Sequence, residues 1–77
     1  MRDKKEQDFL NELGKKIRVF RADKGWSQER LGFKSNLDRT YIGGIERGEE
    51  NPSILVLKKI ADAFEVPMEK LFTKNKE

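Results

Sequence analysis

Arg39 and Thr40 stand at the start of a short segment with helical apolar spacing, and both side chains could recognise the edges of nucleic-acid bases. A guanidinium donates two parallel hydrogen bonds that match O6 and N7 of guanine, and a threonine can contact a base edge or a thymine methyl group. The chain contains no histidine and no cysteine, which removes the commonest general base and most zinc ligands. We therefore predict a binding protein that is not an enzyme and needs no metal or cofactor.

A helical wheel divides residues 39–47 into two sides. Ile42 and Ile45 fall on one side, next to Glu46, and we expect this side to pack in the core. The opposite side carries Arg39, Thr40, Gly43, Gly44 and Arg47. A glycine in a helix costs about 0.8–1 kcal/mol relative to alanine, so two adjacent glycines suggest a close approach to a nucleic-acid groove or to the preceding helix. Tyr41 lies at the border, where core packing and DNA contact are both open.

The start of the preceding helix offers contacts of a second kind. Helix N-termini present unpaired N–H groups and a partial positive charge, and both attract phosphate. Ser27 and Gln28 occupy this position, and Lys34, Arg47 and Asn51 are further phosphate candidates. The predicted partner is therefore double-stranded DNA, with which a net charge of +3 is compatible.

Five helical segments position these residues. Apolar residues recur at steps of three and four over residues 9–24, and Gly25 can end that helix in the left-handed conformation. The following helices are predicted over residues 28–34, 39–47 and 54–64, with Ser27, Asp38 and Ser53 as their N-caps. A last short helix follows Pro67. The turn at residues 35–37 contains Asn36, a residue type that tolerates the left-handed conformation.

We predict a single all-α domain over residues 8–72. A chain of 77 residues leaves room for one domain. The almost wholly polar residues 1–7 and the polar residues 73–77 are predicted to be flexible tails. No apolar run approaches the roughly 20 residues that span a bilayer, and none resembles a signal peptide. We therefore expect a cytoplasmic protein that does not contact a membrane.

Two short helices joined by a three-residue turn form the arrangement that places the second helix in the DNA major groove. Residues 13–18 (LGKKIR), 24–29 (KGWSQE) and 38–48 (DRTYIGGIERG) resemble the Cro and phage-repressor helix-turn-helix family, and the resemblance covers roughly residues 9–72. Within that family, residues 35–42 (SNLDRTYI) are most similar to the controller proteins of restriction-modification systems.

The resemblance implies a five-helix, lambda-repressor-like DNA-binding domain with the helix-turn-helix at its second and third helices. It implies base contacts from Arg39, Thr40, Tyr41 and Gly44, and phosphate contacts from Ser27, Gln28 and Asn51. It also implies that Arg21 pairs with Glu46. Compared with the family pattern, Gly43 replaces a frequent serine, Glu49-Glu50 places acid where base would favour DNA, and Glu65 replaces the usual cap glycine.

The implied function is that of a sequence-specific transcription regulator, and more narrowly that of a restriction-modification controller. Such a controller would bind a palindromic operator as a homodimer and would occlude or recruit RNA polymerase. Its two half-sites would lie about 34–36 Å apart. The C-terminal helices offer more apolar surface than one small core needs, and the predicted dimer interface consists of Ile54, Leu55, Val66, Met68, Leu71 and Phe72. Whether the regulator activates or represses stays open. The alternative is a helix-turn-helix module of the antitoxin or coactivator type, which acts mainly through protein partners.

Overall fold

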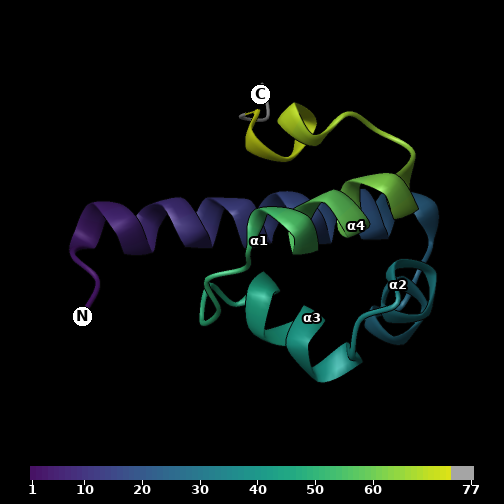
Figure 1. The fold of residues 1–77 in the computed structure, drawn as a ribbon, viewed down its shortest axis with the longest axis horizontal. Helices are drawn as coiled ribbons and strands as arrows, with labels where there is room; N and C mark the ends of the chain where they lie inside the picture. Colours follow the sequence, from purple (N-terminus) through teal and green to yellow (C-terminus); the bar gives the residue numbers. More distant parts are fainter. Residues whose placement is uncertain (74–77) are drawn as a thin grey trace.

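The computed structural model describes residues 1–73, and no strand occurs in that range (Figure 1). The elements are α1 (Lys4–Lys24), α2 (Gln28–Ser35), α3 (Arg39–Glu46), α4 (Ile54–Phe64) and the 3-10 helix η1 (Met68–Phe72). The predicted all-α class is confirmed, but the expected fifth α-helix is a 3-10 helix. The amide of Lys70 donates to the carbonyl of Pro67 at 3.0 Å, and a segment this short favours such i to i+3 bonds.

The first helix begins at Lys4, which corrects the flexible tail predicted over residues 1–7. The Asp3 side chain accepts a hydrogen bond from the Glu6 amide at 2.9 Å, and the Glu6 carboxylate accepts one from the Asp3 amide at 3.1 Å. This capping box satisfies free donors at the helix start, so polar residues without an apolar side can still begin a helix. The predicted tail at residues 73–77 lies outside the described residues, except for the exposed Thr73.

A tight turn joins α2 to α3. Ser27 caps α2 by accepting a hydrogen bond from the Arg30 amide at 3.0 Å. Asn36 ends the helix in the left-handed conformation, with a φ of 60°, and the Leu37 amide then bonds back to the Gly32 carbonyl at 2.8 Å. Asp38 caps the next helix, so only three residues lie between the end of α2 and the start of α3. These local bonds set the angle between the two helices.

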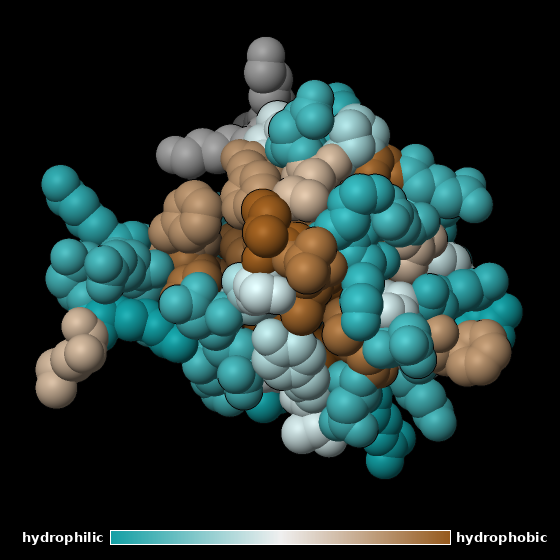
Figure 2. Space-filling view, viewed as in Figure 1, coloured by the Kyte–Doolittle hydropathy of each residue, from teal (hydrophilic) through white to brown (hydrophobic). Residues whose placement is uncertain are grey.

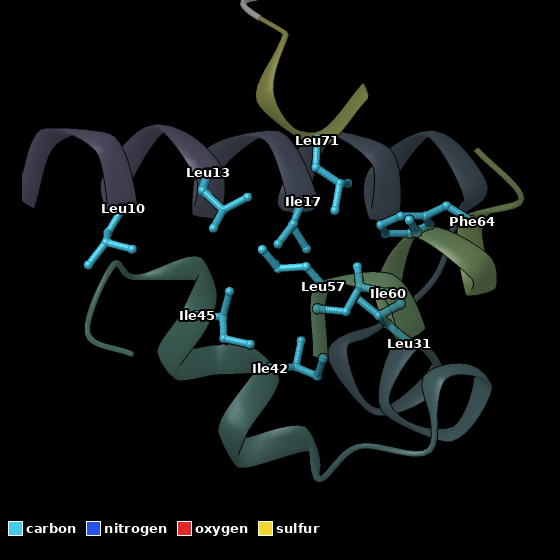
Figure 3. Packing of buried hydrophobic residues seen from close by; sticks show 11 residues of the cluster. Leu10, Leu13, Ile17, Leu31, Ile42, Ile45, Leu57, Ile60, Phe64 and Leu71 are labelled. Carbon is cyan, nitrogen blue, oxygen red and sulfur yellow. The ribbon is translucent and has the colours of Figure 1, made fainter. Parts of the chain in front are cut away.

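One apolar core lies between α1, α2, α3, α4 and η1 (Figure 3). Ile17, Ile42 and Ile60 are fully buried in it. The ring of Phe64 stacks on Phe20 at 5.3 Å and on Trp26 at 5.8 Å between centroids. The buried apolar residues are Leu10, Leu13, Ile17, Leu31, Ile42, Ile45, Leu57, Ile60, Ala61, Phe64 and Leu71. Because Ile42 and Ile45 are both anchored in this core, α3 cannot rotate about its axis without losing their burial.

Candidate nucleic-acid interface

The N-terminal end of α3 projects from the body of the protein. Arg39 and Thr40 are exposed, whereas Ile42 and Ile45, within the next two helical turns, are buried. Figure 1 shows α3 along the edge of the molecule opposite η1. The core therefore holds one side of α3 and leaves the polar side open to a large partner.

The starts of α2 and α3 converge on a shallow hollow of about 590 Å³. Gly43 keeps this hollow open: a Cβ atom there would stand 3.1 Å from Nη1 of Arg47 and 3.3 Å from Oε1 of Gln28. The residues that line the hollow, called the α2–α3 surface below, are Arg21, Ser27, Gln28, Glu29, Arg39, Thr40, Gly43 and Arg47. Five of the predicted contact residues therefore share one surface: Ser27, Gln28, Arg39, Thr40 and Arg47.

Each of the two exposed guanidinium groups of the α2–α3 surface, Arg39 and Arg47, lies beside a carboxylate. Arg47 donates two hydrogen bonds to Glu49, at 2.9 and 3.1 Å. These hydrogen bonds raise the pKa of Arg47 and lower the pKa of Glu49, with a smaller contribution from the attraction of the two charges. Nη1 of Arg39 lies 3.9 Å from Oε1 of Glu29 on α2. The surface is therefore less positive than its arginines alone suggest.

A buried ion pair fixes α3 to α1. Arg21 donates to both carboxylate oxygens of Glu46, from Nε at 2.7 Å and from Nη2 at 2.9 Å. The hydrogen bond to Glu46 raises the pKa of Arg21, against the opposing effect of burial. Nη1 of Arg21 also donates to the Trp26 carbonyl at 2.9 Å. The pair implied by the resemblance is thus present, and it also ties down the segment that leads into α2.

The side chain of Gln28 also contacts this ion pair. Its Nε2 donates to the Glu46 carboxylate at 2.9 Å, and the second N–H of the same amide group can still donate to a phosphate oxygen. The backbone amide of Gln28 remains suitable for phosphate. Ser27 is suitable too, since its oxygen accepts the cap hydrogen bond while its O–H can still donate.

Four other predicted contact residues lie outside the α2–α3 surface. Nζ of Lys34 stands over the Trp26 ring, 5.7 Å from its centroid. Asn51 borders a separate hollow beside Phe9 at the start of α1. Tyr41 is half-buried against the core, and Gly44 is buried.

Two features of the site escaped prediction. Gly14 marks the closest approach of α1 to α3, because a Cβ atom there would overlap the carbonyl oxygens of Ile45 and Glu46. Its position inside a predicted helix was a usable signal, since glycine is unfavourable there. The second feature is a clamp on the loop after α3: Arg2 donates to the carbonyls of Gly48 and Glu49 at 3.1 and 2.9 Å. Polar residues at a chain end gave no signal of it.

The predicted dimer residues divide into exposed and buried groups. Ile54, Leu55 and Phe72 are 64%, 71% and 42% exposed, and Phe9, 55% exposed, stacks on Phe72 with centroids 5.8 Å apart. We call these four residues the apolar patch. Figure 2 shows apolar side chains gathered on the face that α4 presents to the viewer.

Leu71 requires a correction. It is 1% exposed and belongs to the core, because η1 packs against both α1 and α4 and turns this side chain inward. It is therefore unavailable to a partner subunit. Val66 and Met68 are half-buried against the core.

Within residues 1–73, no helix is long and apolar enough to cross a membrane. The same range contains no group of three or more acidic side chains placed to hold a metal ion.

A tight helix pair, with one side of the second helix buried and its polar start exposed, defines a helix-turn-helix protein. The family model HTH_3, described as "Helix-turn-helix", matches residues 15–71. The chain belongs to this family.

Two curated relatives illustrate its range. A Neisseria meningitidis protein described as a hypothetical transcription factor is 43% identical over 61 residues, which cover 79% of this chain and 58% of that protein. Control protein C.BamHI of Bacillus amyloliquefaciens is 46% identical over 55 residues, covering 70% of this chain and 68% of that one. The chain thus spans less than two thirds of the first relative's length. Both relatives are described as regulatory proteins, in agreement with the prediction that the chain is not an enzyme.

Solved structures share the fold. The restriction-modification controller protein C.AhdI from Aeromonas hydrophila has a TM-score of 0.81 and 44% sequence identity, covering 82% of this chain and 96% of that one. The controller protein C.Esp1396I, solved as a tetramer in complex with its natural 35-base-pair operator, has a TM-score of 0.76 and 44% identity, covering 83% and 84%.

Proposed function

We propose that this protein is a sequence-specific transcription regulator that inserts α3 into the DNA major groove. The observation that carries the proposal is the polar start of α3, which projects into solvent while Ile42 and Ile45 hold the helix in the core. Arg39 donates to O6 and N7 of a guanine, and Thr40 contacts a neighbouring base. The Ser27 hydroxyl and the first amides of α2 bind a phosphate beside the groove.

The proposed active form is a homodimer on a palindromic operator. A two-fold axis through the apolar patch would bury the exposed Ile54 and Leu55 of both copies in one self-complementary interface. The two α3 helices would then enter successive major grooves, about 34–36 Å apart. The dimer would act in the cytoplasm and, on its operator, occlude or recruit RNA polymerase.

Within the family, we propose the role of a restriction-modification controller. The similarity to C.BamHI and C.AhdI supports this role, and the operator complex of C.Esp1396I supports operator binding by this fold.

A mobility-shift titration with duplex DNA from upstream of the gene tests the DNA-binding proposal. Arg39→Ala removes the guanine contact from both half-sites, so we expect at least a tenfold loss of affinity, since a bidentate contact is worth about 1–3 kcal/mol. Lys70→Ala on η1 is the charge-matched control, and its affinity should stay within about twofold of the original. If Arg39→Ala and Lys70→Ala bind equally well, the proposed use of α3 is wrong.

Analytical ultracentrifugation tests the dimer. Leu55→Asp places a charge in the apolar patch and should yield monomers, while Val19→Asp, an apolar residue on α1 outside the patch, should leave the dimer intact. A monomeric unmodified protein would refute the homodimer.

The antitoxin or coactivator alternative uses the same patch for a foreign protein. Its supporting observation is that Ile54 and Leu55, two adjacent apolar residues of the apolar patch, are both exposed, since grouped apolar side chains on a surface are typical of a protein–protein contact. A foreign chain that co-purifies in stoichiometric amount, and is lost with Leu55→Asp, would favour this alternative over the homodimer.

A further inference from the structure

The Glu50 side chain lies over Gly44, a position of α3 that has no side chain of its own. Gly44 lies one helical turn after Thr40, on the same side of α3. A Cβ atom on Gly44 would stand 2.8 Å from Cγ and 3.2 Å from Oε2 of Glu50. The Glu50 side chain therefore lies across Gly44, and its carboxylate takes the place of the missing side chain.

The backbone that carries Glu50 is fastened to α3 and to α1. The Glu49 amide donates to the Gly44 carbonyl at 2.9 Å, and the Gly48 amide donates to the Ile45 carbonyl at 3.0 Å. From α1, Gln7 donates to the Gly48 carbonyl at 2.8 Å, next to the bonds from Arg2 described above. The place of Glu50 along α3 is thus set by backbone hydrogen bonds on both sides of the loop.

The two consecutive carboxylates of this loop differ in their partners. Glu49 is bound by Arg47 through two hydrogen bonds. Glu50 is exposed and forms no hydrogen bond or ion pair with any residue in the described part of the chain. An unpaired carboxylate beside a DNA-binding helix would repel phosphate unless it met a hydrogen-bond donor.

The major groove offers such donors on two bases only. Cytosine presents its N4 amino group, and adenine presents its N6 amino group directly beside the acceptor N7. A carboxylate has acceptors only, so it is repelled by the acceptor N7 of adenine. Cytosine has no acceptor beside its N4 amino group in the major groove, and the carboxylate therefore favours cytosine.

We propose that Glu50 is a specificity-determining residue that accepts a hydrogen bond from N4 of one cytosine in each half-site. This inference rests on the proposed insertion of α3 into the major groove. One helical turn advances about 5.4 Å, and successive base pairs are about 3.4 Å apart. The cytosine therefore lies about two base pairs from the base that Thr40 contacts.

The test is a binding titration against an operator set in which every base pair of both half-sites is varied in turn. The original protein should prefer cytosine at one position by about tenfold, and Glu50→Ala should lose that preference while keeping all others. Glu50→Gln should shift the preference at the same position toward adenine, because an amide can pair with both N6 and N7. Glu49→Ala is the matched control from the same loop, and it should leave the preference for cytosine unchanged.

Two outcomes would overturn the inference. If Glu50→Ala raises the affinity for every sequence by the same factor, Glu50 only repels DNA. If Glu50→Ala changes no base preference while Arg39→Ala still loses the preference for guanine, this inference fails and the proposed function stands. A protein without any sequence preference would refute both.

Discussion

The buried carboxylate of Glu46 provides the sharpest test of how α3 is held. Its side chain is only 2% exposed and accepts hydrogen bonds from Nε and Nη2 of Arg21 and from Nε2 of Gln28. In Glu46→Ala the guanidinium, itself largely buried, loses its counter-charge, a change that commonly costs about 3–5 kcal/mol. A domain of this length is stable by about 4–12 kcal/mol. The substitution should therefore remove between a quarter and all of the free energy of unfolding.

Urea denaturation followed by circular dichroism measures the loss. Glu46→Ala should move the midpoint to much lower urea without changing the slope, because the surface exposed on unfolding is nearly unchanged. The double variant Arg21→Met, Glu46→Leu should recover most of the stability, since an apolar pair of similar volume avoids the cost of burying two charges. Asp62→Ala, which removes the exposed partner of Lys58, is the control and should leave the midpoint unchanged.

A loss below about 1 kcal/mol in Glu46→Ala would refute this reasoning, because it would place the pair among screened surface pairs. If the double variant were no more stable than Glu46→Ala, the loss of stability would come from altered side-chain packing at these positions and not from the unpaired guanidinium.

Three further substitutions test other parts of the structure. Glu65→Gly should stabilise the protein by about 0.5–1 kcal/mol in thermal melts, because Glu65 has a φ of +60° and only glycine adopts that conformation freely; Glu65→Ala, which retains the strain, should not. Glu49→Gln should release Arg47 for a phosphate and steepen the dependence of log K on log salt by about 0.9 per protomer. Mild acidification should not substitute for this change, because the bond from Arg47 lowers the pKa of Glu49 and the pair is lost only as the pH falls through that lowered value. Arg2→Ala should accelerate amide exchange at Gly48, whereas Lys5→Ala should not.

Features set by neighbours in the sequence were predictable. The N-caps Ser27, Asp38 and Ser53 and the left-handed Asn36 lie where the sequence predicts them, because each acts on backbone groups within a few residues. The exception among local features is the start of α1. There the apolar pattern begins only at Phe9, whereas the capping box formed by Asp3 lets the helix start earlier.

Features that depend on residues far apart in the sequence were not predictable from pattern alone. The Gln28 amide binds Glu46, eighteen positions away, and no spacing rule shows that one of its two N–H donors is already occupied. Leu71 carries the same apolar character as Leu55, but only the packing of η1 on α1 and α4 decides that the first is core and the second is surface. Residue type thus predicts which groups can bind, and tertiary contacts decide which remain free.

On the proposed mode of binding, the charges around α3 favour discrimination over raw affinity. Binding to DNA of any sequence depends on neutralising phosphates, but Glu49 occupies Arg47 and Glu29 lies near Arg39. These carboxylates weaken the attraction to every duplex alike. Hydrogen bonds to base edges depend on geometry instead, and a matched operator supplies a new partner for Arg39. A dimer reads two identical half-sites, so the difference in binding free energy between the operator and other sequences is counted twice. Such a dimer can bind most DNA weakly and still select its operator.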